Sequence, residues 1–115
     1  MKNKVLNELQ VDITFFVPCF NEEKNITKTL DVIISSISKT SLTYEVLVVD
    51  DKSQDSTKEV VVDYISRLNT RSIFLIENKI NMGLGRNYID TSFIANGKYY
   101  MLINGDNAEP EETIS

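Results

Sequence analysis

The sequence predicts an α/β protein whose mostly parallel sheet is covered by helices on both faces, a three-layer α/β/α arrangement. Short apolar runs alternate with amphipathic segments along the 115-residue chain in the order β-α-β-α-β-α-β. The runs are apolar at consecutive positions, which is typical of strands buried on both faces of a sheet. This alternation implies parallel strands joined by crossover helices.

The individual elements follow from apolar spacing and from the residues that end each segment. We predict strands at 13–17, 44–49, 72–77 and 98–103, and helices at 22–38, 56–68 and 84–95. Pro18 is expected to end the first strand, because proline has no N–H to donate to a neighbouring strand. Asn21 is the expected N-cap of the first helix, and Asn96-Gly97 the expected C-cap signal of the third. Pro110 is typical of the first turn of a further helix.

Composition excludes several classes of partner and site. The net charge is −5, from 12 Lys and Arg against 17 Asp and Glu. An acidic chain is poorly suited to nucleic acid, whose binding depends largely on neutralising phosphates. There is no histidine and one cysteine, Cys19, which excludes an internal disulfide and a histidine-based zinc site. A metal would need oxygen ligands, which favours Mg²⁺ or Mn²⁺.

The chain shows no apolar run near the ~20 residues that a membrane helix needs. Residues 1–11 are polar, lack the apolar core of a signal peptide, and are interpreted as a leader of unknown role. Residues 12–115 then form one domain, expected in the cytoplasm. A sheet that stops at its fourth strand exposes an edge through which a second copy could pair.

The carboxyl ends of the strands are the expected place for a ligand. Open α/β sheets bind ligands there, because parallel strands bring the loops that follow them to one edge. The four loops concerned are residues 18–22, 50–55, 78–86 and 104–107.

Asp50 and Asp51 are the most informative residues of these loops. A carboxylate at the end of a buried strand can accept hydrogen bonds from a ribose or a base N–H, and it is costly to bury without partners. Two interpretations stay open for the residues that follow, Ser53, Asp55 and Ser56. They are either ligand contacts or turn and helix-cap residues.

Two further loops could contact a phosphorylated ligand. Asp106 is a candidate metal ligand, because Mg²⁺ takes one or two protein carboxylates and completes its shell with water and phosphate. Asn104-Gly105-Asp106 is equally ordinary turn chemistry. Gly83 and Arg86 precede or begin a helix and could approach phosphate or base. A plain loop explains them as well.

The segment after the first strand could contact a nucleoside. Phe20 could flank a base, and Glu22 could bond to the base or the ribose. Cys19 is interpreted as a small packed residue and not as a nucleophile, because no histidine is present to activate it.

Together these segments resemble the GT-A glycosyltransferases of family 2, which include dolichyl-phosphate mannose synthases and many bacterial polysaccharide synthases. The resemblance covers about residues 12–110. The matching segments are Val17-Pro18-Cys19-Phe20-Asn21-Glu22 to "VPxYNE", Val48-Val49-Asp50-Asp51-Lys52-Ser53-Gln54-Asp55-Ser56-Thr57 to "VVDDxSxDxT", Asn81-Met82-Gly83-Leu84-Gly85-Arg86-Asn87 to "NxGxxxARN", and Asn104-Gly105-Asp106 to the metal-binding Asp-x-Asp.

The resemblance implies a GT-A, Rossmann-like half that binds a UDP- or GDP-linked sugar. It assigns donor binding to Pro18, Phe20, Glu22, Asp50, Asp51, Gly83, Arg86 and Asn104, and metal binding to Asp106. Family members transfer the sugar to an acceptor hydroxyl with inversion, and a carboxylate base deprotonates the acceptor. The Mg²⁺ or Mn²⁺ ion stabilises the departing diphosphate. Cell-wall or polysaccharide biosynthesis is the implied setting.

Two departures from the family pattern matter. Asn104 stands where the family usually has Asp, and a neutral amide oxygen is a weaker ligand, so metal affinity is lowered or Asp106 binds the metal alone. The family's acceptor half and catalytic base lie C-terminal to this motif. We therefore assign no catalytic residue and expect a donor-binding part that is inactive alone. Later segments could place it at the cytoplasmic membrane face, and the acceptor, a saccharide or lipid-linked glycan, is left open.

Two alternatives remain. One is a non-catalytic nucleotide-binding or interaction module that keeps the fold but not the activity, which Asn104 favours. The other is a receiver-like signalling domain, which also carries an acidic pair after an apolar strand. In receivers the pair follows the first strand, whereas Asp50 and Asp51 follow the second.

Overall fold

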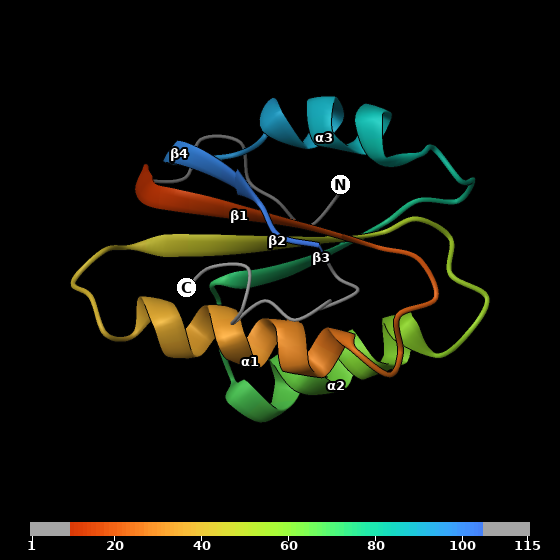
Figure 1. Ribbon diagram of the computed structural model, residues 1–115, viewed down its shortest axis with the longest axis horizontal. Helices are drawn as coiled ribbons and strands as arrows, with labels where there is room; N and C mark the ends of the chain where they lie inside the picture. Colours follow the sequence, from red (N-terminus) through yellow and green to blue (C-terminus); the bar gives the residue numbers. More distant parts are fainter. Residues whose placement is uncertain (1–9, 105–115) are drawn as a thin grey trace.

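The computed structural model describes residues 10–104, which fold into alternating strands and helices in the predicted order (Figure 1). The strands are Val11–Cys19 (β1), Tyr44–Asp50 (β2), Ile73–Glu77 (β3) and Gly97–Leu102 (β4), and the helices are Ile26–Ile37 (α1), Thr57–Leu68 (α2) and Leu84–Ser92 (α3). No helix in this part of the chain is both long enough and apolar enough to cross a membrane. Residues 1–9 of the predicted leader (residues 1–11) and the predicted helix start at Pro110 lie outside the described residues, and Val11 already belongs to β1.

The sheet is parallel, with the strand order β3-β2-β1-β4. Helices α1 and α2 cover one face and α3 covers the other (Figure 1). This confirms the predicted three-layer α/β/α arrangement. The chain runs outward from β1 to β3 and then returns to the far side of β1, so the order reverses between β1 and β4. Such a reversal opens a crevice at the carboxyl ends of the two strands.

The core lies on both faces of the sheet, which explains why the strands are apolar at consecutive positions. Successive side chains of a strand point to opposite faces. On the face covered by α1 and α2, Val17 and Val48 pack with helix residues such as Leu30. On the α3 face, Phe16 and Leu47 pack together in a smaller cluster. All five side chains are fully buried.

Pro18 does not end β1, which continues to Cys19. The register of β1 with β4 ends at Phe16, whereas its register with β2 continues to Cys19. The N–H of Ile103 donates to the carbonyl oxygen of Phe16, so the backbone of Phe16 faces β4. Backbone groups two residues apart in a strand face the same side, so the nitrogen of Pro18, which carries no hydrogen, also faces the β4 side, where the pairing has already ended. Proline therefore limits the ladder on the β4 side and leaves the β2 side intact.

Helix α1 begins at Ile26, four residues later than predicted, and its N-cap is Asn25, without a side-chain cap bond. The prediction that Asn21 is the N-cap of this helix was therefore wrong. Asn21 has a left-handed φ of 55° and its side-chain oxygen accepts a hydrogen bond from the backbone of Gln54. The loop between β1 and α1 is therefore shaped by contacts with the loop after β2, which no local signal specifies.

Helix α3 ends at Ser92, and Gly97 is the first residue of β4 and not a helix cap. A Cβ at Gly97 would lie 2.7 Å from the carbonyl carbon of Ile13, so only glycine fits this approach to β1. The N–H of Gly97 donates to Thr14 Oγ1 at 2.8 Å, and Thr14 Oγ1 donates to the buried Glu45 carboxylate at 2.6 Å. These contacts fix where β4 begins alongside β1.

Strand β4 is an exposed edge. Among the described strands it pairs only with β1, and its Tyr99, Met101 and Leu102 are 68%, 45% and 41% exposed. An apolar groove of about 300 Å³ runs between α1 and this edge. The edge therefore offers both unpaired backbone groups and apolar side chains.

Candidate functional site

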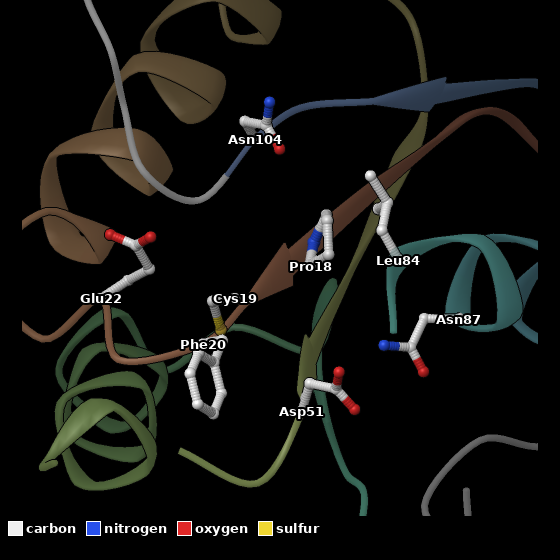
Figure 2. Close-up of a pocket in the computed structure, with 8 residues that line it drawn as sticks. All are labelled: Pro18, Cys19, Phe20, Glu22, Asp51, Leu84, Asn87 and Asn104. Carbon is white, nitrogen blue, oxygen red and sulfur yellow. The ribbon is translucent and has the colours of Figure 1, made fainter. Parts of the chain in front are cut away.

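A cavity of about 310 Å³ lies at the carboxyl edge of the sheet, where the strand order reverses (Figure 2). Its lining residues are Pro18, Cys19, Phe20, Glu22, Asp51, Leu84, Asn87 and Asn104. They come from the ends of β1, β2 and β4 and from the start of α3. The structure thus brings together Pro18, Phe20, Glu22, Asp51 and Asn104, which the sequence predicted to share a site.

The side chain of Asp51 is 6% exposed and is surrounded by donors from the loop after β3. Its Oδ1 accepts from the N–H of Met82 at 2.7 Å and from Asn78 Nδ2 at 2.9 Å, and its Oδ2 accepts from the N–H of Gly83 at 2.9 Å. Burial alone would raise the pKa of Asp51, but these hydrogen bonds together outweigh it and hold the pKa below its ordinary value. Asp51 is therefore a fixed negative charge on the cavity wall.

Asp50 precedes Asp51 in the sequence but, unlike Asp51, is not among the residues that line the cavity. It is 5% exposed, and its Oδ1 accepts from the N–H of Ser53 at 3.0 Å. The two adjacent carboxylates thus bind different loops: Asp50 shapes the turn after β2, and Asp51 binds the loop before α3. Of this pair, Asp51 is the one that can reach a bound ligand directly.

Gly83 and Arg86 lie at the start of α3, outside the cavity lining. Gly83 precedes the helix with φ 85°, a conformation that L residues rarely adopt, and donates its N–H to Asp51. Arg86 pairs with Asp90 at 2.9 Å between Nε and Oδ2, and its side chain is 61% exposed. Gly83 thus shapes the site through Asp51, and Arg86 is paired along its own helix.

Asn104 ends the described part of the chain and is among the residues that line the cavity. Asp106, the predicted metal ligand, lies outside the described residues. Within residues 10–104 no group of three or more acidic or cysteine side chains is arranged to hold a metal ion. The cavity offers side-chain oxygen atoms from Glu22 and Asn104, and oxygen is the ligand type that Mg²⁺ and Mn²⁺ prefer.

Cys19 lines the cavity as a buried thiol whose Sγ lies 3.6 Å from the carbonyl oxygen of Val49. Burial, and then the nearby carboxylates of Asp50 and Glu22, raise the pKa of this thiol above its ordinary value. The thiol therefore stays protonated at neutral pH. This agrees with its interpretation as a packed residue and not a nucleophile.

Ser53 and Asp55 bind backbone groups. Ser53 Oγ accepts from the N–H of Asn21 at 2.9 Å, and Asp55 Oδ1 accepts from the N–H of Thr57 at 2.9 Å. Neither residue is among those that line the cavity. Of the two interpretations left open by the sequence, this favours a structural role.

Leu84 and Asn87 line the cavity but were not predicted as site residues. Asn87 is 4% exposed, and its Oδ1 accepts from Asn78 Nδ2 at 2.7 Å. Figure 2 shows the Asn87 side chain facing Asp51 across the corner of the cavity. The sequence did contain a signal for them, because both residues lie in the segment 81–87, which resembles a motif of the family. The start of α3 had to be placed beside Asp51, the residue after β2, before Leu84 and Asn87 could be recognised as site residues.

The fold and site define a class: an open parallel α/β sheet of order β3-β2-β1-β4 with a cavity of mixed polar and apolar lining at its switch point, as in nucleotide-binding proteins. The chain belongs to glycosyl transferase family 2, whose family model matches residues 14–115. This confirms the resemblance inferred from the sequence motifs.

A curated relative and two solved structures illustrate the similarity. The dolichyl-phosphate β-glucosyltransferase ALG5D of Trichomonas vaginalis is 32% identical over 109 residues, covering 90% of this chain and 33% of its own length. A mannosyltransferase from Pyrobaculum calidifontis, solved with GDP-Man and Mn²⁺, superposes with a TM-score of 0.72 at 23% identity, covering 90% of this chain and 29% of that one. S. aureus TarS 1-349, solved with UDP-GlcNAc, superposes with a TM-score of 0.63 at 27% identity, covering 90% and 30%. The chain spans about a third of the length of the curated relatives it matches.

Proposed function

We propose that this chain is the donor-binding part of a glycosyltransferase, and that its cavity binds a UDP- or GDP-linked sugar together with Mg²⁺ or Mn²⁺. One observation carries the proposal. Residues that are far apart in the chain, from the ends of β1, β2 and β4 and the start of α3, converge on one cavity at the switch point of the sheet, and these residues combine carboxylate and amide groups with an aromatic ring. Family membership supports a nucleotide-linked sugar as the ligand.

The chain's own residues divide the work of binding. Phe20, 45% exposed, offers an aromatic face to a nucleoside, and the fixed carboxylate of Asp51 can accept hydrogen bonds from ribose or base. Glu22 and Asn104 supply further oxygen atoms around the same space (Figure 2). Asn104 and Asp106 would hold the divalent ion, which supplies electrostatic stabilisation of the departing diphosphate.

Transfer of the sugar with inversion requires a base at the acceptor hydroxyl. We assign that base and the acceptor site to no residue of this chain. The 115-residue chain on its own is therefore expected to bind the donor without transferring the sugar. We further propose that binding takes place in the cytoplasm, where nucleotide-linked sugars would meet an acceptor saccharide or lipid-linked glycan.

A non-catalytic binding module of the same fold is the second candidate. Asn104 favours it, because a neutral amide where the family usually has a carboxylate weakens the metal site. The receiver-like alternative conflicts with the strand order: in receiver-type sheets β1 lies between β2 and β3, whereas here it lies between β2 and β4.

Isothermal titration tests the proposed function. The chain is titrated with UDP, GDP and their sugars, each with and without Mn²⁺, and with ATP as a nucleotide control. Phe20→Ala is compared with Phe93→Ala, which removes an 80% exposed ring next to the C-terminus of α3. We expect Mn²⁺-dependent binding that Phe20→Ala weakens and Phe93→Ala leaves unchanged. Lack of binding to every UDP- and GDP-linked ligand would contradict the proposal.

A further inference from the structure

Five hydrogen bonds join the loop after β1 to the loop after β2 and to Thr57, the first residue of α2. They are Asn21 N–H to Ser53 Oγ (2.9 Å), Glu22 N–H to Thr57 Oγ1 (2.8 Å), Glu23 N–H to Asp55 Oδ2 (3.3 Å), Gln54 N–H to Asn21 Oδ1 (2.7 Å) and Ser56 N–H to Glu23 Oε1 (2.9 Å). We call the side chains of Asn21, Glu23, Ser53, Asp55 and Thr57 the loop clamp. Each bond pairs a side chain of one loop with the backbone of the other.

Asp55 is the central member of the loop clamp. Its Oδ2 accepts from Glu23, and its Oδ1 accepts from both the N–H and the hydroxyl of Thr57. The Thr57 side chain is fully buried and in turn accepts from the N–H of Glu22. Asp55 therefore fixes the Thr57 hydroxyl in the orientation that receives Glu22. The hydrogen bonds to its carboxylate hold the pKa of Asp55 below its ordinary value against the opposing effect of burial, so it stays charged at neutral pH.

The loop clamp brackets two residues of the cavity wall. Phe20 and Glu22 line the cavity, whereas none of the five clamp residues is among the residues that line it. Helix α1 begins only at Ile26, so the helix does not fix the N–H groups of residues 21–23. Their partners are the clamp side chains. The Glu22 carbonyl oxygen also accepts from the N–H groups of Asn25 and Ile26, so the positions of Phe20 and Glu22 depend on the loop after β2 together with the start of α1.

We propose that Asp55 is a positioning residue for the donor site, acting through Glu23 and Thr57 to hold Phe20 and Glu22 where a nucleotide contacts them. This inference rests on the proposed function. Removing Asp55 frees residues 20–23, so that a ligand must order them on binding, and the affinity falls. A loss of about tenfold corresponds to one hydrogen bond of ordinary strength.

A double-mutant cycle tests this role with UDP–Mn²⁺ and GDP–Mn²⁺ as the probes. The proteins are the unaltered chain, Asp55→Ala, Phe20→Ala/Glu22→Ala and the triple variant, compared by isothermal titration. If Asp55 acts through the two wall residues, Asp55→Ala weakens binding about tenfold in the unaltered chain and has little effect once those residues are gone. A general structural effect would give the same loss in both backgrounds and would overturn the proposal.

Two further variants sharpen the experiment. Asp63→Ala removes an equal charge from α2, where Asp63 pairs with Arg67, and is expected to leave affinity unchanged. Thr57→Val keeps the shape of Thr57 but removes the acceptor for the Glu22 N–H, so it should reproduce the loss of affinity if Asp55→Ala fails to fold.

Hydrogen exchange should show faster exchange at residues 21–23 in Asp55→Ala than in the unaltered chain. Equal affinity in Asp55→Ala and the unaltered chain would overturn this inference alone, whereas no binding by the unaltered chain would overturn the proposed function and the inference with it.

Discussion

The carboxylate of Asp51 accepts the N–H of Gly83 at 2.9 Å and thereby joins the end of β2 to the residue that precedes α3. The contact spans 32 positions of the sequence. It places the first turn of α3, with Leu84 and Asn87, against the cavity. The same side chain therefore both builds the wall of the site and presents its charge there.

We predict that Asp51→Ala weakens nucleotide binding without unfolding the chain. The change leaves the partly buried N–H groups of Met82 and Gly83 without their acceptor, which costs up to about 3 kcal/mol. A domain of ordinary stability, about 5–15 kcal/mol, tolerates this loss. Urea denaturation measures the stability, and titration with UDP or GDP and Mn²⁺ measures the affinity.

Asp50→Ala is the partner variant. It removes the acceptor for Ser53 but no residue of the cavity wall, so we expect it also to weaken binding, by less than Asp51→Ala. Normal binding by both variants would show that the acidic pair has been wrongly assigned to the site.

We predict that Asp51 makes stability depend on pH in the acid range. Its folded-state pKa lies below the ordinary value of 3.8, so the folded chain binds the proton less readily than the unfolded chain. The contribution is fully present above that ordinary value and is lost as the pH falls through the lower folded-state pKa. Urea midpoints measured from pH 7 downward should therefore fall in acid.

Asp51→Asn should have lower stability at neutral pH and a shallower fall in acid. The role of Asp51 is measured by the difference between the pH profiles of stability of the unaltered chain and of Asp51→Asn. This difference is needed because Asp12 and Asp55 also have lowered pKa values and contribute to both profiles. Two parallel pH profiles would rule out Asp51 as a source of this dependence.

Asn104→Asp is expected to strengthen metal-dependent nucleotide binding. A carboxylate binds Mg²⁺ or Mn²⁺ more strongly than a neutral amide oxygen, and position 104 lines the cavity. The measurement is the ratio of UDP or GDP affinities with and without Mn²⁺. Asn69→Asp, at the C-terminal end of α2, introduces the same charge elsewhere and serves as the control. An unchanged or smaller Mn²⁺ effect would count against this metal site.

Gly97→Ala is expected to destabilise the chain by about 1–3 kcal/mol, because the added methyl would overlap the backbone of β1 at Ile13 and Thr14. Gly85→Ala is the matched control. Gly85 lies within α3 with open space around its missing side chain, so alanine should stabilise the helix by about 0.5–1 kcal/mol. Urea denaturation of the two variants should give changes of opposite sign. Equal changes would show that β1 does not constrain position 97.

We expect the exposed edge of β4 to associate with a second copy of the 115-residue chain. Within residues 10–104, Tyr99 and Met101 lie exposed on a strand that pairs on one side only, and such edges pair readily with other strands. Sedimentation velocity over a range of concentrations should show dimer formation, which Met101→Lys reduces. Val62→Lys, at a 49% exposed position on α2, is the control. A monomer at every concentration would refute the pairing.

The sequence supported a correct prediction of the fold because its signals are local and repeated. Runs of consecutive apolar residues such as 44–49 indicate strands whose two faces are both buried. The segments between these runs have apolar residues at helical spacing, which indicates the helices that connect parallel strands. Element ends were less predictable. Asn21 has the chemistry of an N-cap, yet its side chain serves the backbone of Gln54 in another loop. Gly97 has the chemistry of a C-cap, yet close approach to Thr14 explains why it is glycine.

The sequence by itself determined the α/β class, the family and the edge of the sheet at which we expect a ligand, because these follow from periodicity and from motifs after each strand. The tertiary structure decided what each polar residue does there. Asp50 and Asp51 are neighbours in sequence and equal in chemistry, but one binds the turn at Ser53 and the other binds the loop at Gly83. The physical reason is that a carboxylate's role depends on which donors surround it, and these donors come from loops that only the folded sheet brings together.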